Sequence, residues 1–404
     1  MALAATQRAW TSAATGAPQP RLMPRLALLA AFPFPLPQGS QVYVAEQARA
    51  LARASADVTL LCYGHGLRDD VMMRDLSDAG VHIRTGPAPL SRTPLRAGPH
   101  PRKLGADAAL LGTLLAEQRR SRFDAILAHN AEAACIALAA RALGTPRVVY
   151  VAHTLLESEL RSYASVRAVR TARALDRFGH GLDRFLAARA DAVIALTAAA
   201  AAALAPFAPG RVAHVRPALD PAPPPHPDSV DAACRRHGLV RGAFAVYAGN
   251  LDAYQDLALL ADASTRLGKD KVVIVTHDPR RRPPPGPRVV RAASAREARD
   301  LLFGAALAVV PRRSLGGFPI KLLNYAEAQL AIVAFEGIAD GFTHERDAWL
   351  LPLSAGAAEL ASAIRTLRRD GALAARLGAA ARRLLDARFS WKAAIPATLS
   401  VSGV

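Results

Sequence analysis

Short apolar runs alternate with amphipathic stretches along the first half of the chain. Apolar runs rich in β-branched residues predict buried strands, and apolar positions recurring every three or four residues predict helices. The expected strands cover residues 25–30, 58–62, 81–84, 125–128, 147–151 and 192–196. The expected helices cover residues 41–53, 104–119, 132–143 and 198–204, with an Arg-rich helical region at about 157–190.

The same alternation restarts in the second half, after a proline-dense stretch. Residues 217–229 read PALDPAPPPHPDS, which is too rich in proline for a regular element and predicts a linker. The strands expected beyond it cover residues 244–248, 272–275, 289–291, 306–310, 331–335 and 350–351. The helices expected there lie near 254–267, 295–303, 320–329, 356–370 and 372–387.

Strands that alternate with helices favour parallel sheets covered by helices on both faces. We therefore predict an α/β protein with two Rossmann-like doubly wound domains facing each other across a cleft, where ligands of such sheets bind. The expected domains cover 23–216 and 230–388, joined by the linker 217–229 and followed by a helix at 389–404. Residues 1–22 lack the apolar core of a signal peptide, which predicts a disordered leader or a start codon further downstream.

The chain is strongly basic, with a formal net charge of +18 that comes almost entirely from arginine. Such charge favours anionic membrane surfaces or phosphate-bearing ligands, or else reflects an Arg-rich composition with solvated helix faces. Nucleic-acid binding is not expected, because no nucleic-acid motif or interleaved aromatic residues accompany the charge. The spacing of three to four residues would gather several arginines on one helical face: Arg161, Arg167, Arg170, Arg173, Arg177 and Arg184.

The lengths of the apolar runs and the number and spacing of the cysteines indicate the cellular compartment. No apolar run approaches the roughly 20 residues needed to span a bilayer. The three cysteines, Cys62, Cys135 and Cys234, are widely separated and odd in number, which favours neither a metal site nor a disulfide framework. We therefore expect a cytoplasmic protein, with peripheral attachment to the inner membrane surface left open.

Residues 315–335 carry the densest candidate chemistry. Gly316 and Gly317 can take positive φ and let the backbone approach a ligand closely. A helix beginning just after them would direct unpaired N–H groups at that ligand. Lys321 and Asn324, three residues apart, would share one face of this helix, where the lysine predicts a phosphate or carboxylate contact or a snorkelling helix-edge residue.

Other candidates follow expected strands, at the sheet edge that faces the cleft. Each also has an ordinary structural explanation as a helix cap, a loop residue or a satisfied histidine. An anion or ligand contact is expected from Gly39, Ser40, Gly249, Asn250 and Gln255. We expect the floor of the cleft, or a contact with a sugar hydroxyl, to be formed by His129, Glu132, His153 and Thr154.

Taken in order, these segments resemble the GT-B fold glycosyltransferases, most of all the retaining family-4 enzymes. The resemblance covers roughly residues 24–395 and is carried by VVYVAHTL, RADAVIALT, VYAGNLDAYQDLALLADA and GGFPIKLLNYAEAQLAIVAFEG, among others. It implies transfer of a sugar from a nucleotide sugar with retention, the acceptor on the first domain and the donor on the second. It also implies a final helix that crosses back to the first domain.

The resemblance assigns roles to single residues. It makes His153 and Lys321 the catalytic candidates and His129, Glu132 and Thr154 the acceptor side. It places the donor against Gly39, Ser40, Gly249, Asn250, Gln255, Gly317, Phe318, Pro319, Ile320 and Asn324. It implies no metal and no cofactor, since the nucleotide sugar is a substrate.

Four positions depart from the family pattern. Asn250 stands where arginine is usual and Gln255 where lysine is usual, while Gly316 and Asn324 replace the two glutamates. Charge-assisted hydrogen bonds are about twice as strong as neutral ones, so donor binding would weaken unless Lys321, Arg312 or Arg313 compensates.

Three functions follow. The chain is expected to be an active glycosyltransferase of cell-envelope polysaccharide or glycolipid synthesis, with an unknown acceptor for which a lipid-linked or membrane-proximal molecule is left open. The alternatives are a non-catalytic scaffold or regulatory protein of the same fold, and a basic membrane or nucleic-acid binder.

Overall fold

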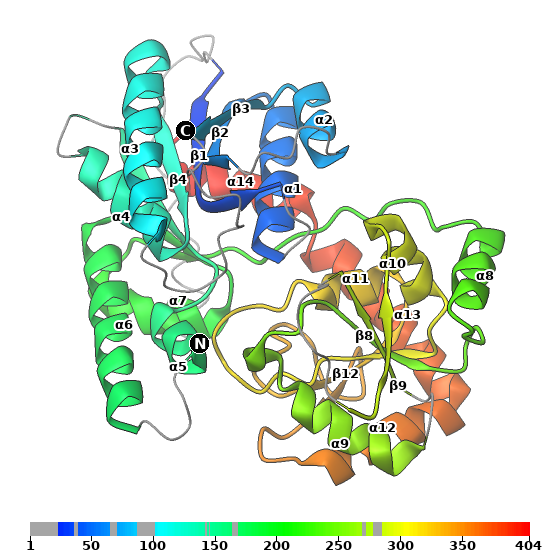
Figure 1. Cartoon of the computed structure of the whole chain (residues 1–404). Coiled ribbons are helices and arrows are strands. Elements are labelled where there is room, and N and C mark those ends of the chain that lie inside the picture. The colour runs from blue at the N-terminus through cyan, green and yellow to red at the C-terminus, as the bar shows by residue number, and fades with distance from the viewer. Residues whose placement is uncertain are drawn as a thin grey trace.

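The computed structural model describes residues 23–35, 39–64, 71–86, 102–141, 144, 146–163, 169–268, 272–277 and 285–404. The expected leader at 1–22 lies outside the described residues, as do Arg167 and the side chains of Arg161 and Arg170. The chain folds into two α/β halves, each built on its own sheet (Figure 1).

The first half is built on a seven-stranded sheet in the order β3-β2-β1-β4-β5-β6-β7, with all its strands parallel. The strands are β1 (Arg25–Phe34), β2 (Asp57–Gly64), β3 (His82–Gly86), β4 (Ala125–His129), β5 (Arg147–Ala152), β6 (Ala192–Ala195) and β7 (Val212–His214). The helices are α1 (Gly39–Arg53), α2 (Val71–Asp78), α3 (Arg102–Ser121), α4 (Asn130–Arg141), α5 (Leu156–Tyr163), α6 (Val169–Arg189) and α7 (Ala198–Leu204).

The second half is built on a six-stranded parallel sheet in the order β10-β9-β8-β11-β12-β13. Its strands are β8 (Ala245–Ala248), β9 (Val272–Thr276), β10 (Arg288–Arg291), β11 (Leu307–Val309), β12 (Ala331–Phe335) and β13 (Trp349–Leu351). Its helices are α8 (Pro227–Arg236), the short η3 (Ala253–Gln255), α9 (Leu257–Leu267), α10 (Ala295–Phe303), α11 (Lys321–Glu327), α12 (Ala357–Arg369) and α13 (Gly371–Arg388).

Burial on both faces explains why the strands are continuous apolar runs. In β1, Leu26 and Leu28 belong to one core, while Ala27 and Leu29 belong to the core on the opposite face of the sheet. A strand covered on both faces has no solvent side, so it shows no alternation of polar and apolar residues. The predicted fold class, two Rossmann-like doubly wound halves, is confirmed.

The last helix, α14 (Trp391–Ser402), leaves the second half and packs on the first. In Figure 1 it lies beside α1 and the first sheet. Trp391, Ala394 and Ile395 belong to a core of the first half. The two halves are therefore joined twice, through residues 215–221 and through the chain leading into α14.

The sequence prediction was wrong at several elements. Part of the expected linker is helical, because His226 caps α8 and Pro227 occupies its first turn, where proline loses no hydrogen bond. The Arg-rich region forms two helices, α5 and α6, rather than one. Strand β7 and helix α2 were missed, since both are short.

Candidate functional site

Segments of both halves meet just after the last residue of β5 and just before the first residue of α11. We call residues 153–155 and 316–317 the junction. Thr154 and Gly317 form an isolated antiparallel bridge. The N–H of Leu155 donates to the carbonyl of Gly316 at 3.1 Å. Candidate residues far apart in sequence are thus brought into contact.

The glycine pair permits this close contact between the two halves. Neither glycine has positive φ, contrary to the prediction. A Cβ on Gly317 would lie 2.5 Å from the carbonyl oxygen of His153, and a Cβ on Gly316 would lie 3.0 Å from the Cβ of Ser158. The missing side chains let two backbones touch, and the glutamate usual at 316 would not fit this arrangement without a shift.

Lys321 is the first residue of α11 and lies over the loop that follows β8. Its Nζ donates to Oε1 of Gln255 at 3.0 Å and stands 3.9 Å from the centroid of the Tyr247 ring. Desolvation holds the pKa of Lys321 well below its ordinary value, helped by the positive charge of Arg312 and opposed by Asp252. A bound anion would stabilise the charged form of Lys321 against both desolvation and the repulsion from Arg312, so this ammonium group is suited to bind a phosphate.

Gly249 lets this loop pass directly beneath the lysine. Its φ is 149°, and a Cβ there would stand 2.8 Å from Nζ of Lys321. Any side chain at 249 would therefore displace the ammonium group. The close approach seen here is to Lys321, and the expected approach of this backbone to a ligand stays a prediction.

The two amides that replace the usual cations form a network with Lys321. Nε2 of Gln255 donates to Oδ1 of Asn250 at 3.0 Å, and Nδ2 of Asn250 donates to Asp252 at 2.7 Å and to Tyr254 at 3.1 Å. Gln255 is nearly fully buried. These amides orient Lys321 instead of adding positive charge of their own.

Arg312 supplies a second cation close to Lys321. Its Nε donates to the carbonyl of Ser314 at 2.9 Å, and its guanidinium stands 5.4 Å from the centroid of the Tyr254 ring. Desolvation lowers the pKa of Arg312. By contrast, Arg313 is engaged by Asp256 at 2.7 Å, so Arg312 is the better candidate for a phosphate contact.

The expected row of free N–H groups on α11 is not present. The N–H groups of Leu322 and Leu323 already donate to the carbonyls of Pro319 and Ile320, both at 2.9 Å. The helix has only seven residues and no side-chain cap. The side chain of Lys321, not the helix end, is therefore the group suited to bind an anion here.

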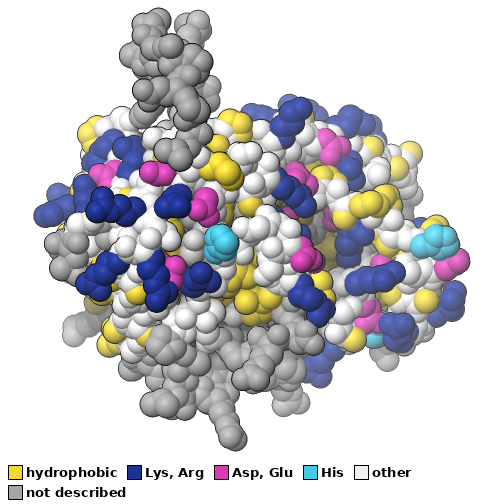
Figure 2. All heavy atoms as spheres, turned by 90° about the horizontal axis from the view of Figure 1, so that it is seen from above, with side chains coloured by type: hydrophobic (Ala, Val, Ile, Leu, Met, Phe, Trp, Pro, Cys, Tyr) yellow, Lys and Arg dark blue, Asp and Glu magenta, His cyan; other side chains and the backbone are white. Residues whose placement is uncertain are grey.

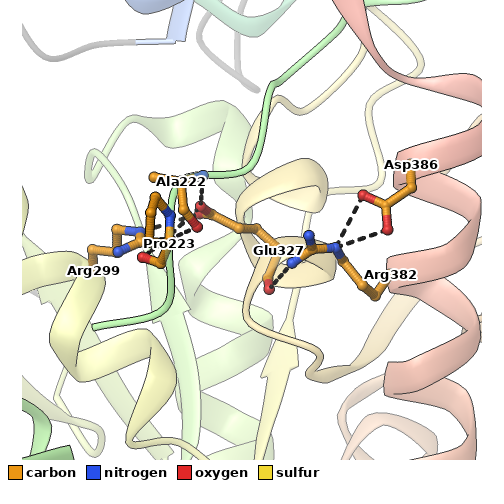
Figure 3. Close-up of polar contacts among 6 residues, drawn as sticks. All are labelled: Ala222, Pro223, Arg299, Glu327, Arg382 and Asp386. Carbon is orange, nitrogen blue, oxygen red and sulfur yellow. Dashed lines mark hydrogen bonds and ion pairs between the residues drawn. The ribbon is translucent and has the colours of Figure 1, made fainter. Parts of the chain in front are cut away.

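The far end of α11 is tied to the connection between the halves (Figure 3). The buried carboxylate of Glu327 accepts from the N–H of Ala222 at 3.0 Å and from Nη2 of Arg299 at 2.8 Å. Arg299 also donates to the carbonyls of Ala222 and Pro223, each at 3.0 Å. The connection beyond residue 221 is thus fixed to the helix that carries Lys321.

On the first half, His153 follows β5 and forms a pair with His129, the last residue of β4. Nδ1 of His129 lies 2.9 Å from Nε2 of His153. The Tyr43 ring packs edge-on against His153, with centroids 5.0 Å apart, and also contacts Trp391. Burial lowers the pKa of His153 to about 3 and holds the pKa of His129 well below its ordinary value, so both rings are neutral at physiological pH.

Glu132 belongs to a charged group on the same edge of the first sheet. It pairs with the buried Lys103 at 2.9 Å. Glu159 of α5 is partly buried, and desolvation together with Glu132 raises its pKa to about 7. A carboxyl that ionises near neutrality is a candidate proton acceptor.

Two family models cover most of the chain. Residues 38–218 match a glycosyl transferase 4-like domain, and residues 243–370 match glycosyl transferases group 1. The chain belongs to the group 1 glycosyltransferases. A search of curated protein sequences finds no match.

Solved structures share the fold of this glycosyltransferase at low sequence identity. Sucrose-phosphate synthase from Thermosynechococcus elongatus matches with a TM-score of 0.72 and 15% identity, covering 93% of this chain and 97% of that one. Anabaena HepE in complex with UDP-glucose matches with a TM-score of 0.70 and 15% identity, covering 95% and 100%. WaaG, a glycosyltransferase involved in lipopolysaccharide biosynthesis, matches with a TM-score of 0.63 and 13% identity, covering 94% and 100%. All three are GT-B glycosyltransferases.

The remaining predicted site residues of this glycosyltransferase lie around the junction. A Cβ on Gly39, which begins α1 just before Ser40, would stand 4.0 Å from a side-chain carbon of Ile320. Ile320 packs against cores of both halves, whereas Phe318, one residue before Pro319, is buried in the core of the second half. Asn324 is partly exposed on the same face of α11 as Lys321.

Sequence reasoning missed Lys103 and the titration of Glu159. The sequence contains a signal for Lys103, because lysine occurs only five times in this Arg-rich chain and each lysine therefore stands out. The perturbation of Glu159 comes from groups brought together by folding, and no local pattern could have indicated it.

Proposed function

We propose that this glycosyltransferase moves a sugar from a nucleotide-sugar donor to an acceptor with retention of the anomeric configuration. The observation that carries the proposal is the meeting of Lys321, Arg312 and the Gly249 loop in the second half. Two cations beside a close backbone approach suit a diphosphate, whose leaving-group charge they would stabilise as the glycosidic bond breaks. HepE, which shares the fold, was solved with UDP-glucose, and this supports a nucleotide sugar as the donor.

Turnover with a panel of nucleotide sugars tests this proposal. We expect nucleotide release from at least one donor, and an anomeric proton signal of retained configuration in the product. Lys321→Ala is expected to lower kcat/KM roughly a hundredfold, since charge-assisted contacts contribute on the order of 1.5–3 kcal/mol. Lys392→Ala, at an exposed site on α14, serves as the matched control. Nucleotide release that is as fast in Lys321→Ala as in the wild-type protein would contradict the assigned donor site.

The neutral amides at 250 and 255 and the glycine at 316 favour one other function. In this alternative the protein is a non-catalytic GT-B scaffold or regulator whose donor site has lost its charges. No turnover from any donor, together with no nucleotide binding by calorimetry, would support it over catalysis.

No metal or cofactor is needed in this proposal, because Lys321 and Arg312 supply the positive charge that a metal ion would otherwise bring. We expect turnover to be unchanged after dialysis against a chelator. A loss that magnesium restores would contradict this.

We further propose a cytoplasmic site of action at the inner membrane surface, on a lipid-linked acceptor of envelope synthesis. Among the described residues, no helix combines the length and apolar character that crossing a membrane requires. The solvent side of α6 instead presents Phe178 and Phe185, which are 60% and 48% exposed. Exposed arginines flank them, namely Arg173, Arg177, Arg184 and Arg189. Exposed rings beside cations favour an anionic lipid surface.

Vesicle co-sedimentation tests the membrane part separately. We expect binding to vesicles containing anionic phosphatidylglycerol, little binding to phosphatidylcholine, and loss of binding in Phe178→Ser/Phe185→Ser. Val240→Ser removes another exposed apolar side chain, on the second half, and should bind like wild type. Equal binding to both kinds of vesicle would contradict the proposal.

A further inference from the structure

The two nitrogens of the His129 ring have different surroundings. Nδ1 lies 2.9 Å from Nε2 of His153. Nε2 of His129 is buried and has no hydrogen-bond partner among the described residues. His129 is fully buried, whereas His153 is 8% exposed at the end of β5. The pair therefore has one deeply buried member and one that reaches the junction.

Only one nitrogen of a neutral imidazole carries a proton, so the contact permits two arrangements. If His129 were protonated on Nε2, that N–H would be buried without an acceptor, which is rare and costly in proteins. If His129 is protonated on Nδ1, its N–H donates to His153 and only a bare lone pair is buried. The second arrangement leaves no N–H of the fully buried His129 ring without an acceptor.

We infer that His129 is a positioning residue that holds His153 in the tautomer protonated on Nδ1. Nε2 of His153 accepts from His129, so its proton resides on Nδ1, and the contact with His129 is the one side-chain hydrogen bond found for His153 among the described residues. This N–H is directed away from His129 and is available to a ligand at the junction. The inference rests on the proposed function for the ligand's identity, which is an oxygen of the donor sugar or its phosphate.

The arrangement assigns His153 one chemical role. A neutral ring with its proton on Nδ1 donates a hydrogen bond from that atom and cannot take up a proton there. His153 would thus act as a fixed donor to substrate oxygen, and His129 would act through it without touching the substrate. Tyr43 packs edge-on against both rings of the pair, and Trp391 packs against Tyr43, which limits rotation of the His153 ring.

Long-range proton–nitrogen correlation NMR on the full chain labelled with ¹⁵N-histidine tests the inference directly. His153→Gln assigns the His153 signals among the 11 histidines. We expect wild-type His153 to show a protonated Nδ1 and an unprotonated Nε2. Protonation on Nε2 in the wild-type protein would overturn the inference, and this result needs neither substrate nor a variant.

Two substitutions of His129 supply the matched comparison. His129→Phe keeps an aromatic ring but removes the donor, and we expect His153 to shift towards protonation on Nε2. His129→Asn can place an amide N–H where Nδ1 stood, and we expect it to restore the wild-type tautomer. A folded His129→Phe protein with an unchanged His153 tautomer would contradict the positioning role.

Kinetics separate this role from a merely structural one. His129→Phe should lower kcat by about tenfold to a hundredfold, with His129→Asn recovering most of it. Combining His129→Phe with His153→Gln should cost no more than His153→Gln alone. Additive losses would contradict an action through His153. If the chain has no turnover at all, the NMR result still decides the inference while the proposed function fails.

Discussion

At the scale of single residues, the protein places titratable groups where their ordinary charge states are disfavoured. Lys321, His153 and Glu159 are held near the junction by packing that removes water from them. The protonation of each group therefore makes the stability of the protein or its ligand binding depend on pH in a way that can be measured.

Glu159 should destabilise the folded protein in alkaline solution. Its pKa rises from 4.5 to about 7 on folding, so the folded state binds the proton more tightly than the unfolded state. Stability is therefore lost as the pH rises from about 4.5 to 7 and stays lower above it. Glu159→Gln should raise the free energy of unfolding at pH 9 by up to about 3 kcal/mol and change it little at pH 4. Urea denaturation at both pH values measures this, with exposed Glu336→Gln as the control. An equal effect at both pH values would contradict the shift.

Lys321 should take up a proton when a nucleotide diphosphate binds. Its lowered pKa leaves the ammonium group partly deprotonated in alkaline solution, and the bound phosphates would raise that pKa again. Affinity should therefore fall as the pH rises. Calorimetry at pH 9 in buffers of different ionisation enthalpy should reveal net uptake of up to about one proton. Lys321→Gln should abolish this uptake, and Lys392→Gln should not. Uptake that survives in Lys321→Gln would assign the proton to another group.

At the scale of elements, α11 is held at both ends. Its first residue lies over the Gly249 loop, and its last residue holds the connection between the halves through Glu327 and Arg299 (Figure 3). The junction also fixes the turn that precedes α11, because Gly317 pairs with Thr154 of the first half.

Glu327→Gln should destabilise the protein much more than Asp386→Asn. The first change removes a buried charge that satisfies Arg299 and the N–H of Ala222. The second weakens an exposed pair with Arg382, in which Asp386 is 51% exposed. We expect losses of about 1–3 kcal/mol and below about 0.5 kcal/mol in the free energy of unfolding, measured by urea denaturation. Equal losses would show that the connection is not fixed by Glu327.

Gly317→Ala should open the junction. The new Cβ would stand 2.5 Å from the carbonyl oxygen of His153, so the two backbones must separate. We expect faster hydrogen exchange at the amide of Leu155, whose hydrogen bond to Gly316 crosses the junction. Gly371→Ala adds a Cβ in open space and should leave this exchange unchanged. Unchanged exchange in Gly317→Ala would mean that the halves are not in contact there.

Sequence reasoning predicted the elements far better than their contacts. Every strand except β7 was identified, because burial on both faces leaves an uninterrupted apolar signal, as in β12. The face of α11 shared by Lys321 and Asn324 was also local enough to predict. The contact that Gly316 and Gly317 make could not be predicted, because their neighbours include residues 153–158 of the other half. The same holds for the His129–His153 pair, which depends on two strands being adjacent in the sheet.

At the scale of the whole molecule, basic side chains are mixed with acidic ones on the face that Figure 2 shows. Figure 2 shows Lys and Arg side chains across the visible face, with Asp and Glu between them rather than one continuous positive field. The net charge of +18 therefore does not mark a single binding surface by its magnitude alone. The donor site depends on two cations held in place, and the proposed membrane face depends on the rings of α6.

The proposed function requires that a nucleotide-sugar diphosphate binds beside Lys321, across the junction from His153. A crystal structure of the protein soaked with UDP-glucose tests it most directly. We predict diphosphate density within hydrogen-bonding distance of Nζ of Lys321 and next to the Gly249–Asn250 backbone. Diphosphate density elsewhere on the chain, or its absence at saturating concentrations of every nucleotide sugar tried, would contradict the claim.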